Sequence, residues 1–349
     1  MPETVSIFDA AAVESLRKQL RLDPQRIRAF RNSLLKKFLP DETALQDVSD
    51  SDRWSMHCLE LFRRCDSELD GASKLLFRTA TGMLIEAVIL RIATGRTTLC
   101  VSSQVGCAAA CDFCATGRMG IAQNLSAAEI LDQVLQAGQL LTHEQRRLQN
   151  IVFMGMGEPF HNETQLYAAL EILTAPDQFD RTPGSILIST VGIPDAMLRC
   201  AEQFPRINLA LSLHSARQDI RESMIPLAKK YPLAELKETL QQINRHQERE
   251  VMLEYLMLAG RNDSPGDADA LIEWAAGLQV HLNLIPFNAI DDAPHLTATP
   301  PDKISEFANR LKAAGLKTTI RYSLGSDIAA ACGQLVRREN RRHAMESHP

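Results

Sequence analysis

The stretch CAAACDFC, residues 107–114, places three cysteines within eight positions, and no fourth cysteine follows closely enough to complete a set of four. A structural zinc site usually takes four ligands, often arranged in pairs. An iron–sulfur cube also normally takes four thiolates, so three would leave one iron without a protein ligand. The spacing therefore keeps two interpretations open: a zinc site, or a cluster with one metal position available to a substrate.

The segment after these cysteines alternates between helical and strand-like patterns. Ser126 and Glu129 form a capping box before a helix expected over residues 127–141, and the apolar run NIVFMGMG follows it. Further helices are expected near residues 163–174, 195–204, 234–246, 267–277 and 301–314, with strand-like runs between them. Counting TTLCVSSQ, the pattern gives six β–α units, too few for a closed eight-stranded barrel. We therefore predict an α/β fold with a partial, open (βα)6 barrel.

Polar residues of this predicted barrel gather at the C-terminal ends of its strands. In parallel α/β folds this edge carries the functional groups. The residues found there, in strand order, are Cys107, Gly157 with Glu158, Ser189, Ser212 with His214, and Asn288. The sequence thus predicts a site at this edge.

The chain ahead of the barrel has a different pattern. Asp23 and Pro24 predict the start of an amphipathic helix. We expect a small helical N-terminal domain over residues 1–70 whose basic residues could contact a phosphate backbone, a core over residues 71–335 and a basic tail over residues 336–349. Within residues 74–104 the runs KLLFRTA, MLIEAVIL and TTLCVSSQ predict a short antiparallel β extension leading into the barrel.

Composition narrows the class of protein. The chain has 349 residues, 45% of them hydrophobic, and a net charge of −5, which argues against a strongly basic nucleic-acid binder. No apolar run approaches the length of a membrane span, and the first residues do not resemble a signal peptide. We expect a cytoplasmic protein whose eight cysteines act as ligands, nucleophiles or buried apolar residues rather than as structural disulfides.

Three cysteines at C-x3-C-x2-C, with Phe113 just before the third, resemble the radical S-adenosylmethionine superfamily. That resemblance implies a 4Fe-4S cluster held by Cys107, Cys111 and Cys114, whose remaining iron binds the amino and carboxylate groups of S-adenosylmethionine. The motif GMGEP, residues 155–159, is compatible with this, because glycines let the backbone approach a ligand and Glu158 could accept from an ammonium group. Taken alone, GMGEP could also be a glycine-rich turn.

A second set of motifs resembles the RlmN/Cfr family of RNA methyltransferases over residues 70 to 335. These motifs are TTLCVSSQVGC, GMGEP, LSLHS, NLIPFN and GSDIAAACGQL. The resemblance implies that one S-adenosylmethionine methylates Cys332, that a second yields a 5′-deoxyadenosyl radical, and that Cys100 resolves the RNA adduct by forming a disulfide. Both thiols should then face the mouth above the three cluster cysteines. Contacts to S-adenosylmethionine would fall on Gly157, Glu158, Ser189, Ser212, Leu213, His214 and Asn288.

Glu86 interrupts the apolar run MLIEAVIL. The resemblance implies that it accepts the proton lost from the adduct carbon. Without the resemblance, an exposed charge on an edge strand would be the better interpretation of this residue.

The resemblance further implies that the enzyme methylates C2 or C8 of an adenosine in 23S rRNA, and also in tRNA. It implies a monomer that takes electrons from a donor such as flavodoxin or ferredoxin. GMGEP fits the C2-methylating pattern, whereas GSDI and FCATG are nearer the C8 pattern, so both carbons stay open. Two other hypotheses are a radical enzyme of this fold with a different RNA, protein or small-molecule substrate, and a zinc-stabilised protein that binds RNA through its basic terminal segments.

Overall fold

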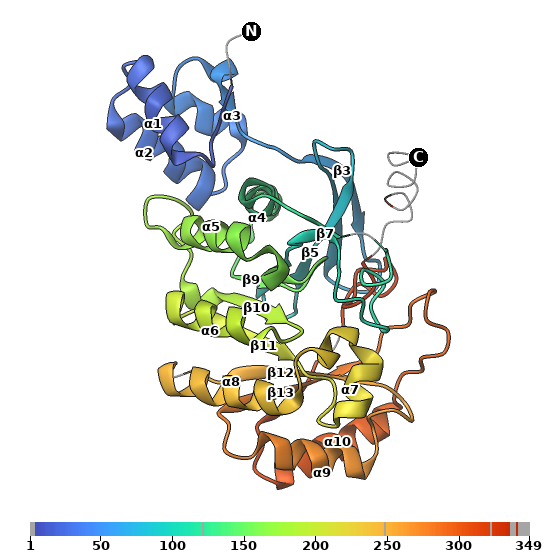
Figure 1. The fold of residues 1–349 in the computed structure, drawn as a ribbon. Coiled ribbons are helices and arrows are strands. Elements are labelled where there is room, and N and C mark those ends of the chain that lie inside the picture. The colour runs from blue at the N-terminus through green and yellow to red at the C-terminus, as the bar shows by residue number, and fades with distance from the viewer. Residues whose placement is uncertain (1–3, 121, 248, 322, 336–339, 341–349) are drawn as a thin grey trace, which may run out of the picture.

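A computed structural model describes residues 4–120, 122–247, 249–321, 323–335 and 340. Its main element is a ten-stranded sheet in the order β14-β13-β12-β11-β10-β9-β6-β5-β4-β3 (Figure 1). The parallel part of the sheet consists of β6 (Thr97–Cys100), β9 (Asn150–Phe153), β10 (Ile186–Thr190), β11 (Asn208–Ser212), β12 (Val251–Met257), β13 (Val280–Pro286) and β14 (Thr318–Ile320). These strands do not close into a full barrel, because β14 lies at one end of the sheet and β3 at the other.

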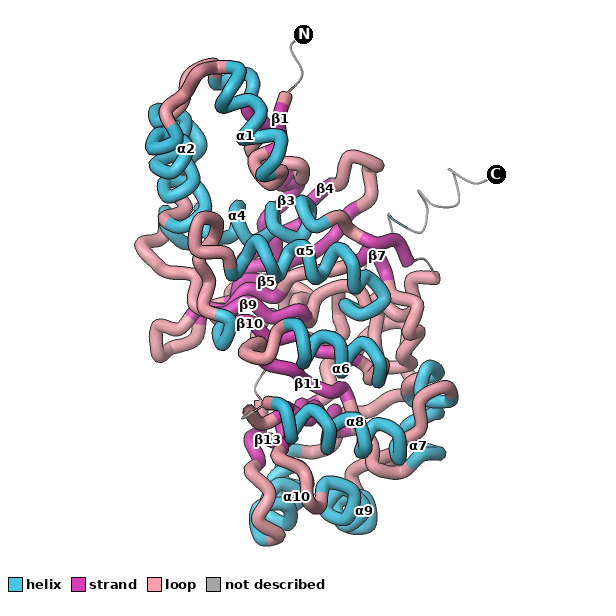
Figure 2. The backbone as a smooth tube through the Cα atoms, turned by 60° about the vertical axis from the view of Figure 1, so that its left-hand side comes forward, coloured by secondary structure: helices cyan, strands magenta, loops and turns pink. Residues whose placement is uncertain are grey.

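Helices follow the parallel strands and cover one face of the sheet (Figure 2). They are α4 (Ala127–His143), α5 (Glu163–Thr174), α6 (Pro194–Gln203), α8 (Leu233–His246), α9 (Pro265–Ala275) and α10 (Pro301–Ala313). The predicted β–α alternation and the partial barrel are confirmed, and the predicted capping box of Ser126 and Glu129 starts α4. The short helix α7 (Gln218–Met224) was not predicted.

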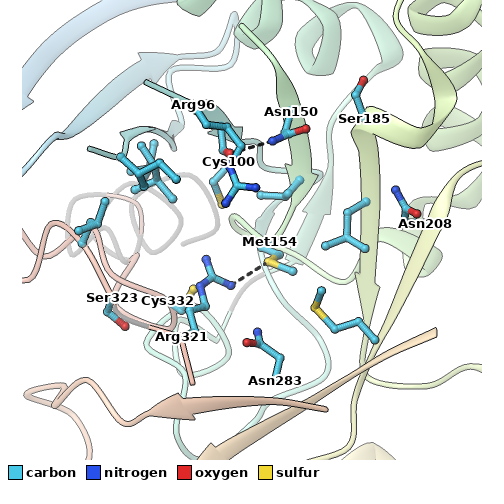
Figure 3. Close-up of a pocket in the computed structure, with 18 of the residues that line it drawn as sticks. Arg96, Cys100, Asn150, Met154, Ser185, Asn208, Asn283, Arg321, Ser323 and Cys332 are labelled. Carbon is cyan, nitrogen blue, oxygen red and sulfur yellow. Dashed lines mark hydrogen bonds between the residues drawn. The ribbon is translucent and has the colours of Figure 1, made fainter. Parts of the chain in front are cut away.

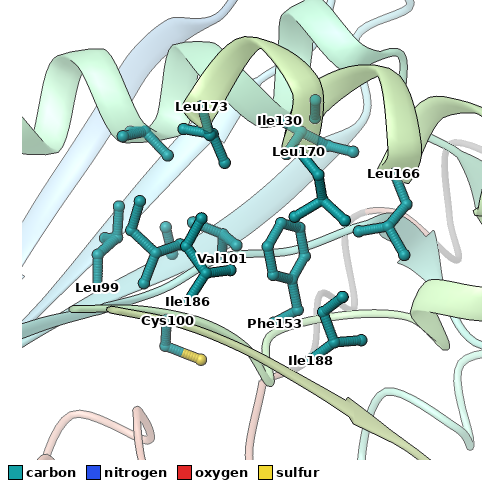
Figure 4. Close-up of a cluster of buried hydrophobic side chains, with 14 of the residues drawn as sticks. Leu99, Cys100, Val101, Ile130, Phe153, Leu166, Leu170, Leu173, Ile186 and Ile188 are labelled. Carbon is teal, nitrogen blue, oxygen red and sulfur yellow. The ribbon is translucent and has the colours of Figure 1, made fainter. Parts of the chain in front are cut away.

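The alternation of β6 decides which residues face the helices. Leu99 and Val101 point toward α4 and α5 and pack with Phe153 and Leu170, whereas Cys100 points to the opposite face (Figure 4). Successive side chains of a strand point to opposite faces. Leu99 and Val101, which flank Cys100 in the sequence, therefore pack in the core between sheet and helices. The Cys100 thiol is turned toward the inner face of the partial barrel.

The antiparallel extension is larger than predicted. Strands β4 (Ala72–Arg78) and β5 (Leu84–Arg91) match two of the predicted runs, and β5 pairs antiparallel with β6. The run TTLCVSSQ divides into β6 and β7 (Gln104–Gly106), which pairs with β8 (Ala122–Asn124). Strand β3 (Glu60–Asp66) adds an outer edge by pairing with β4. The domain boundary at residue 71 stays a prediction, although the sheet already begins ahead of it.

The N-terminal segment is helical, with α1 (Ala10–Gln19), α2 (Pro24–Arg31), a π-helical turn (Asn32–Lys36) and α3 (Asp41–Ala44), while short strands β1 (Val5–Ser6) and β2 (Trp54–Ser55) pair beside them. The Asp23 side chain accepts from the backbone N–H of Gln25 at 2.8 Å and caps α2, as predicted. Apart from Asn340, the predicted basic tail lies outside the described residues.

A histidine connects this segment to α4. His57 Nδ1 lies 2.7 Å from the Asp132 carboxylate, and its Nε2 lies 3.0 Å from that of Asp41. Burial alone would lower the pKa of His57, but the hydrogen bonds to Asp132 and Asp41 outweigh it and raise the pKa to about 10. The imidazolium therefore ties α3 to α4 at neutral pH.

None of the helices in the described part of the chain is long and apolar enough to cross a membrane.

Candidate active site

The three cysteines of CAAACDFC line one pocket, called the cysteine pocket below. Its other walls come from the C-terminal ends of β9 to β13 and from the loop around Cys332, through Met154, Glu158, Ser189, Ser212, His214, Leu256, Ile285, Cys332 and Gly333 among others. The cysteine loop is held at two backbone points: Asp112 N–H donates to the Met224 carbonyl at 2.9 Å, and Ala115 N–H to the Gly333 carbonyl at 2.7 Å. The pocket thus joins residues far apart in the sequence.

The chemistry of the three thiols fits a cluster. Burial raises the pKa of Cys107 to about 12 and also raises those of Cys111 and Cys114, and the proximity of Cys107 and Cys114 raises that of Cys111 further. Three thiolates are stable here only if a cationic group compensates them. A cube binds each thiolate through a separate iron and can leave one iron without a protein ligand, so a set of three thiols suits it.

Gly157 and Glu158 form a rigid corner of the cysteine pocket. Gly157 has φ +109°, and a Cβ atom there would lie 2.7 Å from Cβ of Gln104. The Gln104 side-chain oxygen accepts from the backbone N–H of Glu158 at 2.8 Å. Gln104 therefore fixes the turn that presents Glu158, although no sequence pattern had singled it out.

The carboxylate of Glu158 is held by three donors. It accepts from the Val191 and Phe160 backbone N–H groups at 2.8 and 3.0 Å and from the Thr190 hydroxyl at 2.8 Å. Burial raises the pKa of Glu158 to about 7, although these hydrogen bonds oppose the shift. A cationic partner would lower that pKa and favour the ionised form. The arrangement therefore suits a side chain that receives an ammonium group.

Ser189 and Ser212 share an acidic partner that the sequence analysis did not identify. The Ser189 hydroxyl donates to the Glu254 carboxylate at 2.6 Å, and the Ser212 hydroxyl lies 3.4 Å from the same oxygen. Glu254 is buried on β12 and lines the cysteine pocket. Glu254 interrupts the apolar run EVMLEYLML that contains β12. A charged residue inside an apolar strand is costly to bury, so this interruption is the sequence signal that could have identified it.

The remaining predicted cofactor residues divide into two groups. His214 lines the pocket, packs edge-on against Phe113 with ring centroids 4.8 Å apart, and accepts from the Leu256 backbone N–H through Nδ1. Leu213 instead packs into the main core, and Asn288 donates to the Ser323 hydroxyl and the Cys332 carbonyl at 3.0 and 3.3 Å. The side chain of Leu213 thus lies away from the pocket, whereas Asn288 holds the Cys332 loop.

A second, larger cavity of about 1040 Å³, called the interior cavity below, lies on the inner face of the sheet. Cys100, Cys332 and Arg321 all line it (Figure 3). Met154 and Cys332 line both this cavity and the cysteine pocket. The two thiols that the family resemblance pairs therefore face one space, and Cys332 stands where that space meets the cysteine pocket. Every cysteine of the chain is a free thiol in this structure.

Glu86 is not the exposed edge charge that was the alternative interpretation. It lies on β5, between β4 and β6, and is fully buried. Its carboxylate is 3.8 Å from the Lys74 ammonium, which also donates to the Ala329 carbonyl at 3.1 Å. Val88, on the same face of β5, lines the interior cavity. Glu86 thus lies beneath the loop that carries Cys332.

Comparison with known proteins agrees with this architecture. Residues 101–275 match the model of the radical SAM superfamily. The chain is 60% identical to a probable RNA methyltransferase of Rhodopirellula baltica, over 99% of this chain and 91% of that protein. It is 40% identical to a probable dual-specificity RNA methyltransferase RlmN of Thermus thermophilus, over 81% of this chain and 79% of the relative.

A solved structure extends the similarity to three dimensions. A radical SAM methyltransferase from Sphaerobacter thermophilus superposes with a TM-score of 0.88 and 35% sequence identity, covering 95% of this chain and 99% of that one. The superfamily match, the identity over nearly the whole chain and the shared fold lead to one conclusion. The chain belongs to the radical SAM superfamily and, within it, to the RlmN/Cfr family of RNA methyltransferases.

Proposed function

We propose that this protein methylates C2 or C8 of an adenosine in RNA by radical chemistry, with Cys332 as the carrier of the one-carbon unit. The observation that carries the proposal is the position of Cys332 in the wall between the cysteine pocket and the interior cavity. A methyl group on this sulfur would be open to the cysteine pocket on one side and to an RNA base on the other. A protein that only binds RNA has no use for such an arrangement.

The cysteine pocket is proposed to hold a 4Fe-4S cluster on Cys107, Cys111 and Cys114. When bound there with S-adenosylmethionine, the cluster supplies a 5′-deoxyadenosyl radical. The protein's part is to orient the cofactor and exclude water. The Glu158 carboxylate, already fixed by three donors, receives the amino group, while Gly157 allows close approach of the backbone. The other proposed contacts to S-adenosylmethionine come from Ser189, Ser212, the backbone of Leu213, His214 and Asn288.

The interior cavity is proposed to receive the adenine base. A base taken out of its stack needs a shaped pocket with polar groups for its edges. The side chains of Asn150 and Asn283 offer such groups, and Arg96 and Arg249 add positive charge for the phosphate backbone. Asn150 and Asn208 begin β9 and β11, so the cavity extends from the N-terminal ends of the strands to Cys332. This suits entry of RNA from that end.

Three side chains are proposed to complete the reaction after the base has bonded to the carbon on Cys332. Glu86 accepts the proton that the base carbon loses, and the unpaired electron of the adduct returns to the electron-transfer partner that supplied the priming electron, so that a closed-shell thioether remains. The Cys100 thiolate then attacks the Cys332 sulfur, forming a disulfide while the sulfur–carbon bond breaks. The electron pair of that bond leaves with the carbon, which takes up a proton and becomes the methyl group. A disulfide needs Cα atoms within roughly 4.4 to 6.8 Å, so the Cys332 loop must bring the two thiols together at this step.

The wider setting of the proposal follows the family. The RNA is 23S rRNA, and also tRNA; the electron comes from a flavodoxin or ferredoxin; and the protein acts as a cytoplasmic monomer. Residues 1–70 form an accessory domain that contacts RNA, and residues 71–335 form the catalytic core.

Anaerobic reconstitution with iron and sulfide, followed by incubation with rRNA and tRNA, tests the proposal. Mass spectrometry of the nucleosides should show 2-methyladenosine or 8-methyladenosine, and the peptide that contains Cys332 should carry one added methyl group. Cys332→Ala should lose both products, and Cys100→Ala should retain a methylated Cys332 yet fail to release product. Cys200→Ala is the matched control, because this thiol is buried in α6 away from both pockets.

Each alternative hypothesis has its own signature in this experiment. Turnover of S-adenosylmethionine that survives Cys332→Ala would indicate a radical enzyme with another substrate. A colourless protein that retains zinc and never methylates Cys332 would indicate an RNA-binding module and overturn the proposal.

A further inference from the structure

Arg221 is a buried arginine next to the cysteine loop. It lies on α7, the short helix that follows the LSLHS segment, and its side chain is fully buried. Met224, at the end of the same helix, accepts the Asp112 backbone N–H of the cysteine loop. Helix α7 thus links Arg221 directly to the segment that carries Cys111 and Cys114.

The guanidinium of Arg221 is only partly satisfied by the protein. Nη2 donates to the Val191 carbonyl at 2.5 Å and lies 3.4 Å from the Ser212 carbonyl. Nε and Nη1 are buried and have no hydrogen-bond partner among the described residues. No carboxylate in the described ranges forms an ion pair with Arg221. A buried charge without a counter-charge is costly, so this arrangement points to an anionic group close by.

The contacts of Arg221 indicate where that group lies. Its Nη2 binds the carbonyls of Val191 and Ser212, and both of these residues line the cysteine pocket. Met224 of the same helix packs in one apolar cluster with Cys111. The anion that Arg221 faces is therefore on the side of the cysteine loop.

A cluster on three thiolates would supply this anion. An oxidised cube of charge +2 with three thiolates carries a net charge of −1, and the one electron that primes radical formation brings it to −2. A buried cation next to such a group stabilises the reduced form more than the oxidised form.

We propose that Arg221 is a positioning residue that compensates the charge of the reduced cluster and raises its reduction potential. The electron itself comes from the external donor, and Arg221 undergoes no chemical change. The inference goes beyond the proposed RNA methylation, since it concerns only how readily the cluster accepts an electron. It requires the cluster but not the RNA substrate.

The test is a redox titration of the reconstituted protein, monitored by electron paramagnetic resonance, in the absence of RNA. Arg221→Met should lower the ratio of reduced to oxidised cluster at the wild-type midpoint at least tenfold, which for one electron is a shift of about 59 mV to more negative potential. Arg221→Lys, which keeps the charge, should fall between the two. The matched control is Arg181→Met, since Arg181 is a half-buried arginine with a buried Nε that donates to two carbonyls, those of Leu148 and Gln149, at the opposite ends of the strands.

The outcomes separate this inference from the proposed function. Equal midpoint potentials in wild type, Arg221→Met and Arg221→Lys, at equal iron and sulfide content, would overturn the role of Arg221 and leave RNA methylation standing. Should Arg221→Met fail to assemble a cluster, the pair Arg221→Gln and Arg221→Lys decides in the same way. A wild-type protein that assembles no cube would overturn both, and a shifted potential without RNA methylation would overturn only the proposed function.

Discussion

At the scale of single residues, Gly157 combines two requirements that no other residue type meets. Its φ of +109° lies outside the range of L side chains, and an added Cβ would meet Gln104 at 2.7 Å. Since Gln104 also binds the backbone of Glu158, a displacement at Gly157 is passed on to the carboxylate. The backbone conformation of Gly157 therefore determines the orientation of the Glu158 side chain.

Gly157→Ala is therefore expected to weaken S-adenosylmethionine binding and to destabilise the fold by about 1–3 kcal/mol through backbone strain. Denaturant unfolding and anaerobic calorimetric titration with S-adenosylmethionine measure the two effects. Gly277→Ala is the matched control, because Gly277 has φ +79° but nothing within 4 Å of an added Cβ. If both variants bound the cofactor as wild type does, the link from Gly157 to Glu158 would be wrong.

The sequence identified the residues that lie in recognisable motifs and missed those that act across long chain separations. Cys107, Cys111 and Cys114 were predicted together, and they line one pocket. Gln104, Glu254 and Arg221 were not predicted, because each gains its role from a partner on another element. Leu213 shows the opposite case. It was predicted to contact the cofactor because it lies in a motif, yet its side chain packs into the core.

At the scale of elements, α4 supports the segment that leads to the cysteine loop. Its buried Gln133 donates to the Ser102 carbonyl at 3.0 Å and accepts from the Ser102 backbone N–H at 2.9 Å. Ser102 lies between β6 and β7, where the chain leaves the main sheet. One side chain therefore replaces the sheet hydrogen bonds that Ser102 lacks.

Gln133→Leu should cost about 1–3 kcal/mol of unfolding free energy, since it leaves a buried donor and acceptor unsatisfied. It should also lower the iron retained after reconstitution, because the cysteine loop loses its support. Gln139→Leu makes the same change on the same helix, but Gln139 binds Leu39 and Asp41 of the N-terminal segment. Iron loss in the Gln139 variant equal to that in the Gln133 variant would contradict this account.

The helices were predicted to within a few residues because capping residues and apolar periodicity mark them. Helix α7 was missed because its seven residues are too few to show a helical period. The break between β6 and β7 within TTLCVSSQ was not predicted, because both halves of this run are strand-like. The interruption depends on the hydrogen bond of Ser102 with Gln133, thirty-one positions further along the chain. Strand β3 was overlooked because it is largely exposed and lacks the alternation of a half-buried strand.

At the scale of the whole molecule, the contact of His57 with Asp41 and Asp132 joins the N-terminal segment to the core. The folded-state pKa of His57 is raised to about 10 from its usual 6.5. A raised histidine pKa contributes stability that is fully present below the unfolded pKa and is lost as the pH rises through the folded pKa. The relevant window is therefore pH 6.5 to about 10.

His57→Gln should lower the unfolding free energy most at pH 6.5, and its difference from wild type should shrink toward pH 10. Denaturant unfolding at intervals of pH measures this difference. For the control variant His281→Gln, the difference should stay constant above pH 6.5, because burial lowers the pKa of His281 and its titration lies below that window. A His57 difference that stays constant or grows with pH would refute the ionic link.

Strand β3 has a consequence for anyone who shortens the chain. Residues 1–70 were predicted to form a separate helical domain, yet a polypeptide starting at residue 71 would lack the partner of β4, six of whose seven residues are buried. Its unpaired N–H and C=O groups would invite strands of other molecules. Arg63, Arg64 and Asp66 on β3 now oppose such pairing with charge. We expect the shortened protein to precipitate, and a version that starts before Glu60 to stay dispersed, as light scattering would show.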